Sequence, residues 1–294
     1  MSTITPAHAL TIELPITLTS PLHHGAGTSG NTSILRTQEV IQPDGSSVRV
    51  PFVSAASLRH HLRDRLAWHA AEHVGFTALS KAEVDLLWTG GALTTTGAEV
   101  DLEEPRMVEE HYPALGLMGY AAQSDIMAGT LRASDLVLVC RENAWRLPPG
   151  LPSELIGQRA AAFRTEEFGT RHDVASSPVA RLVSAAELLT AATKTTQMIW
   201  DVQALKAGSM LYGTLGLTPS ASEGHKLALA AAVALWAPGG RAVLGAKNAQ
   251  GFGHAEVAFE TGVVEWARDG LARWTEHVVA HAPEIRTLIA RLTR

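Results

Sequence analysis

Arg59 and Arg63 are the residues whose chemistry and spacing point most directly to a role. They lie four positions apart, after a turn bounded by Pro51, in a segment with leucines at helical spacing. Two arginines one helical turn apart face the same side, and backbone amides at a helix start, such as that of Ser57, attract anions. The sequence therefore predicts that a phosphate-sized anion binds there. The competing interpretation is an ordinary solvated helix face.

Two glycine-rich turns carry further polar side chains. One follows a predicted strand and begins at the histidine pair His23 and His24, and the other spans 245–253 with Lys247, Asn248 and Gln250. Glycine lets a backbone approach a ligand closely, so these side chains could hold a phosphate or a base edge. The alternatives are an ordinary tight connection and a strand end exposed to water.

A histidine pair offers a different chemistry. His69, Glu72 and His73 match the His-x-x-Glu-His pattern of inverted zinc proteases. Both histidines, however, are in phase with the apolar face of their helix, and no acidic helix downstream supplies a third ligand. Cys140 lies in an apolar strand without a Cys or His partner. We therefore expect structural histidines, a cysteine in the core, and neither a metal nor a cofactor.

Composition limits the kinds of protein this chain can be. With 294 residues, 46% hydrophobic and 18% charged, it predicts one large folded unit without a membrane span or a secretory signal. A single cysteine fits the cytoplasm. The formal charge of −5 argues against indiscriminate nucleic-acid binding, so any RNA site must be local. The basic residues expected to form it are Arg36, Arg49, Arg59, Arg63 and Arg65.

Hydrophobic periodicity predicts an α+β fold. The predicted elements are a strand over 11–19, a helix from 54, paired strands over 195–205 and 209–217, a helix over 222–236 and a strand over 252–260. This is the ferredoxin-like order that RNA-recognition domains also use. Pro15 favours an edge or bulged position for the first strand. Two amphipathic helices are expected after residue 260.

Three motifs, in their order along the chain, resemble those of the RAMP superfamily. The stretch 18–27 is similar to its first strand and glycine turn, 50–63 to its helix start, and 245–253 to its C-terminal glycine loop. Leu117-Met118-Gly119 is similar to its Leu-Phe-Gly. Within the superfamily the chain looks like the backbone subunit of CRISPR effector complexes, which lines up along guide RNA. His60 departs from the family by replacing a small residue.

The resemblance implies a division of the chain. Residues 1–294 would form a single RAMP domain with a ferredoxin-like, RRM-like palm and large insertions. A finger-like insertion would cover 75–160, a thumb-like insertion 164–194, and C-terminal helices 261–294. In the palm, Arg36, Arg59, Arg63 and Lys247 would hold phosphates. In and beside the thumb, the candidates for RNA contact are Arg164, Arg171, His172 and Arg181.

The resemblance also bears on catalysis. Target-cleaving members carry an aspartate a few residues before an arginine, and counting back from Arg36 reaches Asn31. An amide cannot act as a general base or hold a divalent metal as a carboxylate does. The resemblance therefore implies a subunit that binds RNA without cutting the target.

The partners implied are guide RNA, copies of the chain in a helical filament, other CRISPR effector subunits, and a target nucleic acid that pairs with the guide. A type IV complex is preferred and type I is close behind. The alternative is a RAMP-family endoribonuclease that processes CRISPR RNA. In that enzyme His23, His24 or His172 would act as acid or base on a ribose 2′-hydroxyl.

Overall fold

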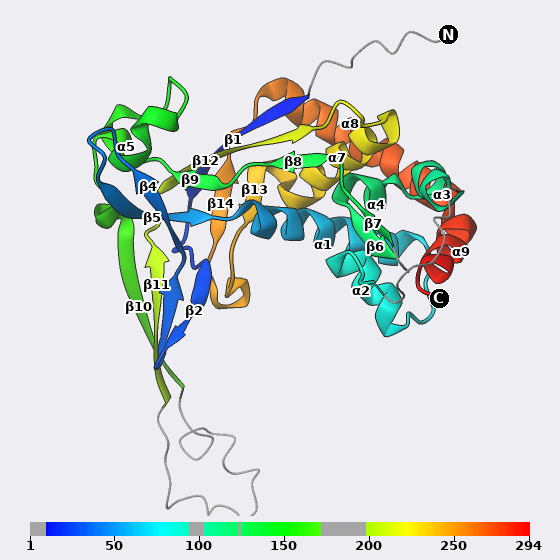
Figure 1. The fold of residues 1–294 in the computed structure, drawn as a ribbon, viewed down its shortest axis with the longest axis horizontal. Coiled ribbons are helices and arrows are strands. Elements are labelled where there is room, and N and C mark those ends of the chain that lie inside the picture. The colour runs from blue at the N-terminus through cyan, green and yellow to red at the C-terminus, as the bar shows by residue number, and fades with distance from the viewer. Residues whose placement is uncertain (1–9, 94–102, 123–124, 172–197) are drawn as a thin grey trace, which may run out of the picture.

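The fold combines a large sheet, two smaller sheets and a group of helices (Figure 1). It is known from a computed structural model, which describes residues 10–93, 103–122, 125–171 and 198–294. The large sheet crosses the upper part of the view. Helices α2, α3, α4 and α9 gather at the right, and strands β2, β10 and β11 occupy the lower left of the view.

Four antiparallel strands form the centre of the large sheet. Their bounds are β1 Thr11–Leu18, β9 Leu136–Leu138, β12 Met210–Leu217 and β14 His254–Val257. They lie in the order β14, β1, β12, β9, and each neighbouring pair is antiparallel. With helices between β1 and β9 and between β12 and β14, this is the ferredoxin-like arrangement. The predicted α+β fold with a ferredoxin-like core and insertions is confirmed.

The large sheet extends beyond this centre on both sides. It continues from β9 into β5 and β4, and from β14 into β13, while β8 pairs with the end of β12. The bounds are β4 Thr37–Ile41, β5 Ser47–Val53, β8 Leu131–Ala133 and β13 Arg241–Val243. Strands β4 and β5 thus lie between the first glycine turn and the helix that begins at Ala55. The stretch 75–160, expected as a finger-like insertion, supplies β8 and β9 to the main sheet.

The predicted hairpin between 195–205 and 209–217 is wrong. The first of these strands, β11 (Met198–Leu205), pairs with β10 and β3, and the second is β12. The chain turns between them because Leu22 exchanges two backbone hydrogen bonds with Leu205, and Gly208 donates to Leu18. Both strands alternate apolar and polar residues, and alternation alone does not specify a partner.

Pro15 does not place its strand at an edge, because β1 lies between β12 and β14. The ladder to β14 covers only Ile16, Thr17 and Leu18, and Pro15 accepts a hydrogen bond from the amide of Ala258 just past its end. The N and C=O of one strand residue point to the same side. The missing N–H of Pro15 therefore faces a position where the ladder has already ended, and an internal strand tolerates the proline.

Helices α1 (Ala55–His73) and α7 (Glu223–Trp236) connect the central strands and contact each other. Leu58, Leu62 and Leu66 of α1 are buried, as their spacing predicts. The two expected C-terminal helices are α8 (Thr261–Ala280) and α9 (Ala282–Leu292). Helix α8 approaches α7 closely, since a Cβ on Gly270 would lie 2.3 Å from the Cβ of Ala230.

A four-stranded sheet lies beside the main one, in the order β10, β11, β3, β2. Its further strands are β2 Gly25–Ser29, β3 Thr32–Leu35 and β10 Arg164–Arg171. Strands β10 and β11 flank 172–197, which contains most of the predicted thumb and lies outside the described residues. This sheet therefore joins the first glycine turn to the base of that segment.

Shorter elements complete the chain. They are α2 Lys81–Thr89, α3 Glu103–His111, α4 Pro113–Met118, β6 Tyr120–Ala122, β7 Asp125–Met127, η1 Arg141–Arg146, α5 Ser153–Ile156, η2 Ala160–Phe163, η5 Pro238–Gly240 and η6 Asn248–Gln250. Strands β6 and β7 form a sheet of their own. In the part of the chain that the structure describes, no helix has the length and apolar character needed to cross a bilayer.

Candidate nucleic-acid interface

The start of helix α1 already carries an anion from the chain itself. The carboxylate of Asp135, just before β9, accepts a hydrogen bond of 2.8 Å from the amide of Ala55, the first helical residue. The hydroxyl of Ser54 accepts another from the amide of Ser57. A helix start offers few free amides, and these contacts use two of them. The predicted anion site at this helix start is therefore occupied internally.

Arg59 and Arg63 point toward the chain rather than toward an external phosphate. Arg59 donates to the carbonyls of Leu131 (2.5 Å) and Met118 (2.7 Å). Arg63 donates to those of Met118 (2.9 Å) and Gly119 (2.8 Å). Burial, and then the neighbouring Arg59, lower the pKa of Arg63 to about 10. It remains charged at neutral pH.

Arg59 and Arg63, predicted to hold phosphates, are thus engaged with backbone carbonyls of the chain itself, and phosphate binding by them stays a prediction. The two arginines fasten α1 to the C-terminal end of α4, where Leu117-Met118-Gly119 lies, and Arg59 also reaches β8 at Leu131. Two of the motifs that resemble the RAMP superfamily thus bind each other. Their pairing explains the residue types by structure, since buried carbonyls need donors and a guanidinium supplies several.

The two glycine turns meet, as the sequence requires if they share one site. His23 and Ala246 form a β-bridge, and the amide of Gly253 donates to the carbonyl of Pro21. The ring of His23 is buried, and its Nδ1–H donates to the carbonyl of Gln203 at 2.8 Å. His23 was expected to add a donor to an open groove. In the structure its ring instead joins the first turn to β11, and an RNA contact of His23 stays a prediction.

His24 is neutral at physiological pH. Burial is the main cause that lowers its pKa to about 4, and the charge of Arg36 adds to the effect. Its Nε2 accepts a hydrogen bond of 3.2 Å from the amide of Ser54. A general acid or base works best when its pKa lies near the working pH. This environment does not suit His24 for proton transfer at neutral pH.

The downstream turn is closed by its own amide side chain. Nδ2 of Asn248 donates to the carbonyls of Leu244 (3.0 Å) and Phe252 (3.1 Å), so this residue shapes the loop. Lys247 has a left-handed backbone, with φ of 61°. Its ammonium lies 5.3 Å from the ring centroid of Trp200, within the range of a cation–π contact. Gln250 is exposed beside it.

Gly253→Ala is expected to lower the free energy of unfolding by more than about 3 kcal/mol, because a Cβ there would meet a fixed backbone atom. The φ of Gly253 is +80°, and its Cβ would lie 2.0 Å from the carbonyl oxygen of Leu244. Urea unfolding measures the change.

Gly251→Ala is the matched control for this substitution. Gly251 has a φ of +87°, and its Cβ would have no neighbour within 4 Å. Only the left-handed backbone then costs energy, about 1 kcal/mol. Equal losses in the two variants would show that the loop relaxes around the clash.

The polar side chains on the solvent side are fewer than the sequence predicts. Arg36 is exposed, with its Nε donating to the carbonyl of Gly25 at 3.1 Å, and Asn31 is exposed in the turn between β2 and β3. Arg164 is exposed at the start of β10, and Arg171 ends that strand. The predicted contacts at His172 and Arg181 lie outside the described residues.

The histidine pair His69 and His73 has structural contacts. Nε2 of His69 lies 2.9 Å from the hydroxyl of Thr275, and Nδ1 of His73 donates to the carbonyl of His69. The two rings stack with centroids 4.2 Å apart. Within the described residues, no three His, Cys, Asp or Glu side chains are grouped as a metal site would need. Cys140 is buried, which raises the pKa of its thiol to about 12.

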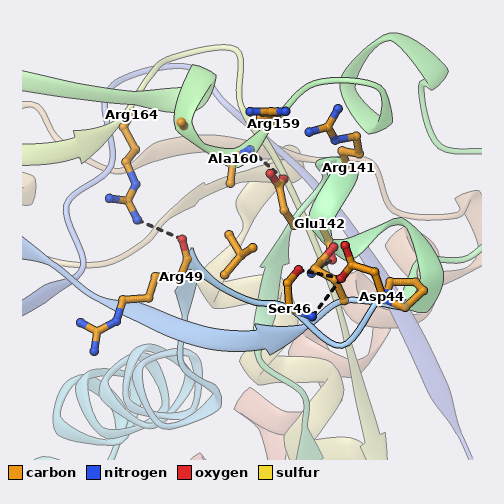
Figure 2. Close-up of a pocket in the computed structure, with 12 residues that line it drawn as sticks. Asp44, Ser46, Arg49, Arg141, Glu142, Arg159, Ala160 and Arg164 are labelled. Atoms are coloured by element: carbon orange, nitrogen blue, oxygen red, sulfur yellow. Dashed lines mark hydrogen bonds between the residues drawn. The ribbon is translucent and has the colours of Figure 1, made fainter.

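Two arginines that no sequence motif marks are brought together by the fold. Arg141 and Arg159 line one cavity with Arg49 and Arg164 (Figure 2). The four residues come from separate segments, and none belongs to a short motif, so no local pattern connects them. Trp200 lies in β11, and its contact with Lys247 depends on a loop far along the chain, so no local pattern indicates it.

Comparisons with known proteins place this geometry in context. No protein-family model matches the chain, and no curated protein matches it. Among solved structures, the chain is similar to one described as "Type IV-B CRISPR Complex". The TM-score is 0.58 with 20% sequence identity, and the alignment covers 86% of this chain and 91% of that chain. At this identity the likeness establishes a shared fold.

Proposed function

We propose that this protein is a non-catalytic subunit of a CRISPR effector complex, which binds guide RNA and assembles along it with further copies of itself. The observation that carries the proposal is the shared fold with a chain of a type IV-B CRISPR complex over nearly the full length of both chains. The order of the RAMP-like motifs supports it independently. Type IV is the preferred class, and the cytoplasm the compartment.

The surface around the two glycine turns supports an RNA-binding role. Arg36 and Lys247 flank the point where the turns meet, because the amide of Arg36 donates to His24 while Ala246 pairs with His23. Glycines 25 and 27 leave the first turn without bulky side chains. A ribose-phosphate chain can lie close to such a backbone and be held by cations at its phosphates. Contacts of this kind leave base edges free to pair with a target. The sequence of the guide RNA, and not the protein, would then select the target.

The contacts of the histidines favour binding over RNA processing. His23 is buried and bonded to a backbone carbonyl, and His24 has a pKa of about 4. Neither environment suits proton transfer at a ribose 2′-hydroxyl. Asn31 adds an amide where the resemblance aligns a catalytic aspartate.

Incubating the purified protein with CRISPR repeat RNAs of increasing length, in the presence of a metal chelator, tests the proposal. We expect the RNA to remain intact and to form complexes whose size increases stepwise with RNA length, as seen by native electrophoresis and mass photometry. Cleavage products would favour the endoribonuclease, and a single complex size at all lengths would contradict assembly along RNA.

A further inference from the structure

An open cavity of about 960 Å³ lies apart from the glycine turns, between the β4–β5 hairpin and the segments around η1 and η2. Figure 2 shows four arginines around it, contributed by β5, η1, the start of η2 and β10. They are Arg49, Arg141, Arg159 and Arg164. The chain as a whole is acidic, with a formal charge of −5. A local gathering of four guanidiniums is therefore a feature of this cavity and not of the surface in general.

The guanidiniums retain donors for a ligand. Arg141 and Arg159 are exposed, and within the described part of the chain their side chains make no hydrogen bond or ion pair. Arg164 uses one nitrogen, which donates to the backbone carbonyl of Arg49 at 3.3 Å. The ion pair of Arg49 with Glu39 spans 3.5 Å between well-exposed side chains and contributes little. Most N–H donors of the four guanidinium groups are thus available to a ligand.

The two carboxylates on the cavity wall are already engaged. Glu142 is buried and accepts a hydrogen bond of 2.8 Å from the amide of Ala160, as the dashed line in Figure 2 shows. Asp44 accepts from the amide (2.9 Å) and the hydroxyl (2.7 Å) of Ser46. These acids stabilise their own loops and do not pair with the arginines. The lining of the cavity thus carries four positive side chains and two negative ones, and both negative side chains are hydrogen-bonded to backbone amides.

We propose that this cavity binds phosphate groups of a nucleic-acid strand, as a second anion site beyond the glycine turns. The inference rests on the proposed RNA-binding function and extends it to this surface. Arginine matches phosphate with two parallel hydrogen bonds and is never deprotonated in this pH range. A nucleic-acid strand fits better than a protein partner, because nucleic-acid interfaces are much more positively charged than protein–protein interfaces.

The cavity is connected to the glycine turns through one sheet. Arg164 begins β10, and β10 pairs along its whole length with β11, which in turn pairs with β3 beside the first turn. Its bond to Arg49 joins this sheet to β5 of the main sheet. The two anion sites are thus held by one rigid hydrogen-bonded unit, as a strand that crosses both would require.

A cavity variant, Arg141→Ala with Arg159→Ala, tests the site, because neither side chain has a partner whose loss would disturb the fold. The matched control, Arg241→Ala with Arg273→Ala, removes the same charge from exposed positions outside the cavity. The probe is a mixed-sequence single-stranded RNA. We expect the dissociation constant of the cavity variant to rise about tenfold over the control, and its log-log salt slope to fall by about 1.4.

Equal RNA affinity and salt slope in the cavity and control variants would overturn the site. If the unmodified protein does not bind RNA at all, the proposed function fails. The anion site is then tested separately by adding pyrophosphate and measuring the melting temperature of each protein. If pyrophosphate raises the melting temperature of the unmodified protein and of the control, but not that of the cavity variant, the anion site is supported. An equal change of melting temperature in all three proteins would contradict it. Loss of self-association in the cavity variant without RNA, at unchanged RNA affinity, would assign the cavity to an acidic surface of a second copy and overturn the proposal.

Discussion

Replacing Arg63 with alanine is expected to lower the free energy of unfolding by about 3 kcal/mol, because the carbonyl of Gly119 would lose its charged donor and that of Met118 would keep only Arg59. Arg63 donates to Met118 and Gly119. These carbonyls lie at the C-terminal end of α4, against α1, where water cannot easily replace the guanidinium. Urea unfolding monitored by circular dichroism measures the change.

Arg65→Ala is the matched control, since Arg65 is an exposed arginine on the same helix. Its substitution is expected to change the unfolding free energy by less than about 0.5 kcal/mol. If Arg63→Ala unfolds like Arg65→Ala and yet loses RNA binding, then Arg63 holds a phosphate after all. The bonds to the carbonyls would in that case contribute little.

Reversing both charges at the meeting point of the glycine turns is expected to weaken RNA binding strongly. Arg36→Glu with Lys247→Glu should raise the dissociation constant on the order of 100-fold, because two phosphate contacts become repulsive. The effect should be equal for RNAs of unrelated sequence, since phosphates are the same in all of them. Fluorescence anisotropy across several sequences and salt concentrations measures both properties.

The control for this variant reverses two exposed arginines elsewhere, Arg241→Glu with Arg273→Glu. It changes the net charge of the chain by the same amount. An equal loss of binding in the control would attribute the effect to the overall field of the protein. A loss confined to some RNA sequences would contradict phosphate binding and indicate base contacts.

Local pattern was sufficient to predict α1, α7, α8, α9 and the general class of the fold, but not the shorter helices α2 to α5. Leu58, Leu62 and Leu66 repeat at helical spacing and are buried together, and the two C-terminal helices follow the same rule. Strand partners were harder to predict. The strand at 136–138 is short and reads like part of an insertion, yet it occupies the position that the sequence seemed to give to β11.

The orientation of polar side chains could not be predicted. Arg59 and Arg63 flank the apolar face of α1, so either water or another segment could cover them. The covering carbonyls of Met118 and Gly119 lie 55 and 56 positions beyond Arg63, and nothing in the local sequence refers to them. The arginine cavity has the same origin, because its members meet only after the sheets have formed.

The carboxylate of Asp135 at the first amide of α1 gives the protein a built-in counter-ion. A strand of RNA that passes this helix start meets a surface whose positive end is already balanced, so it gains nothing by stopping there. Attraction for RNA phosphates would then come from cations elsewhere that no carboxylate neutralises. Under the proposed function, the start of α1 would therefore not be a point at which RNA is held.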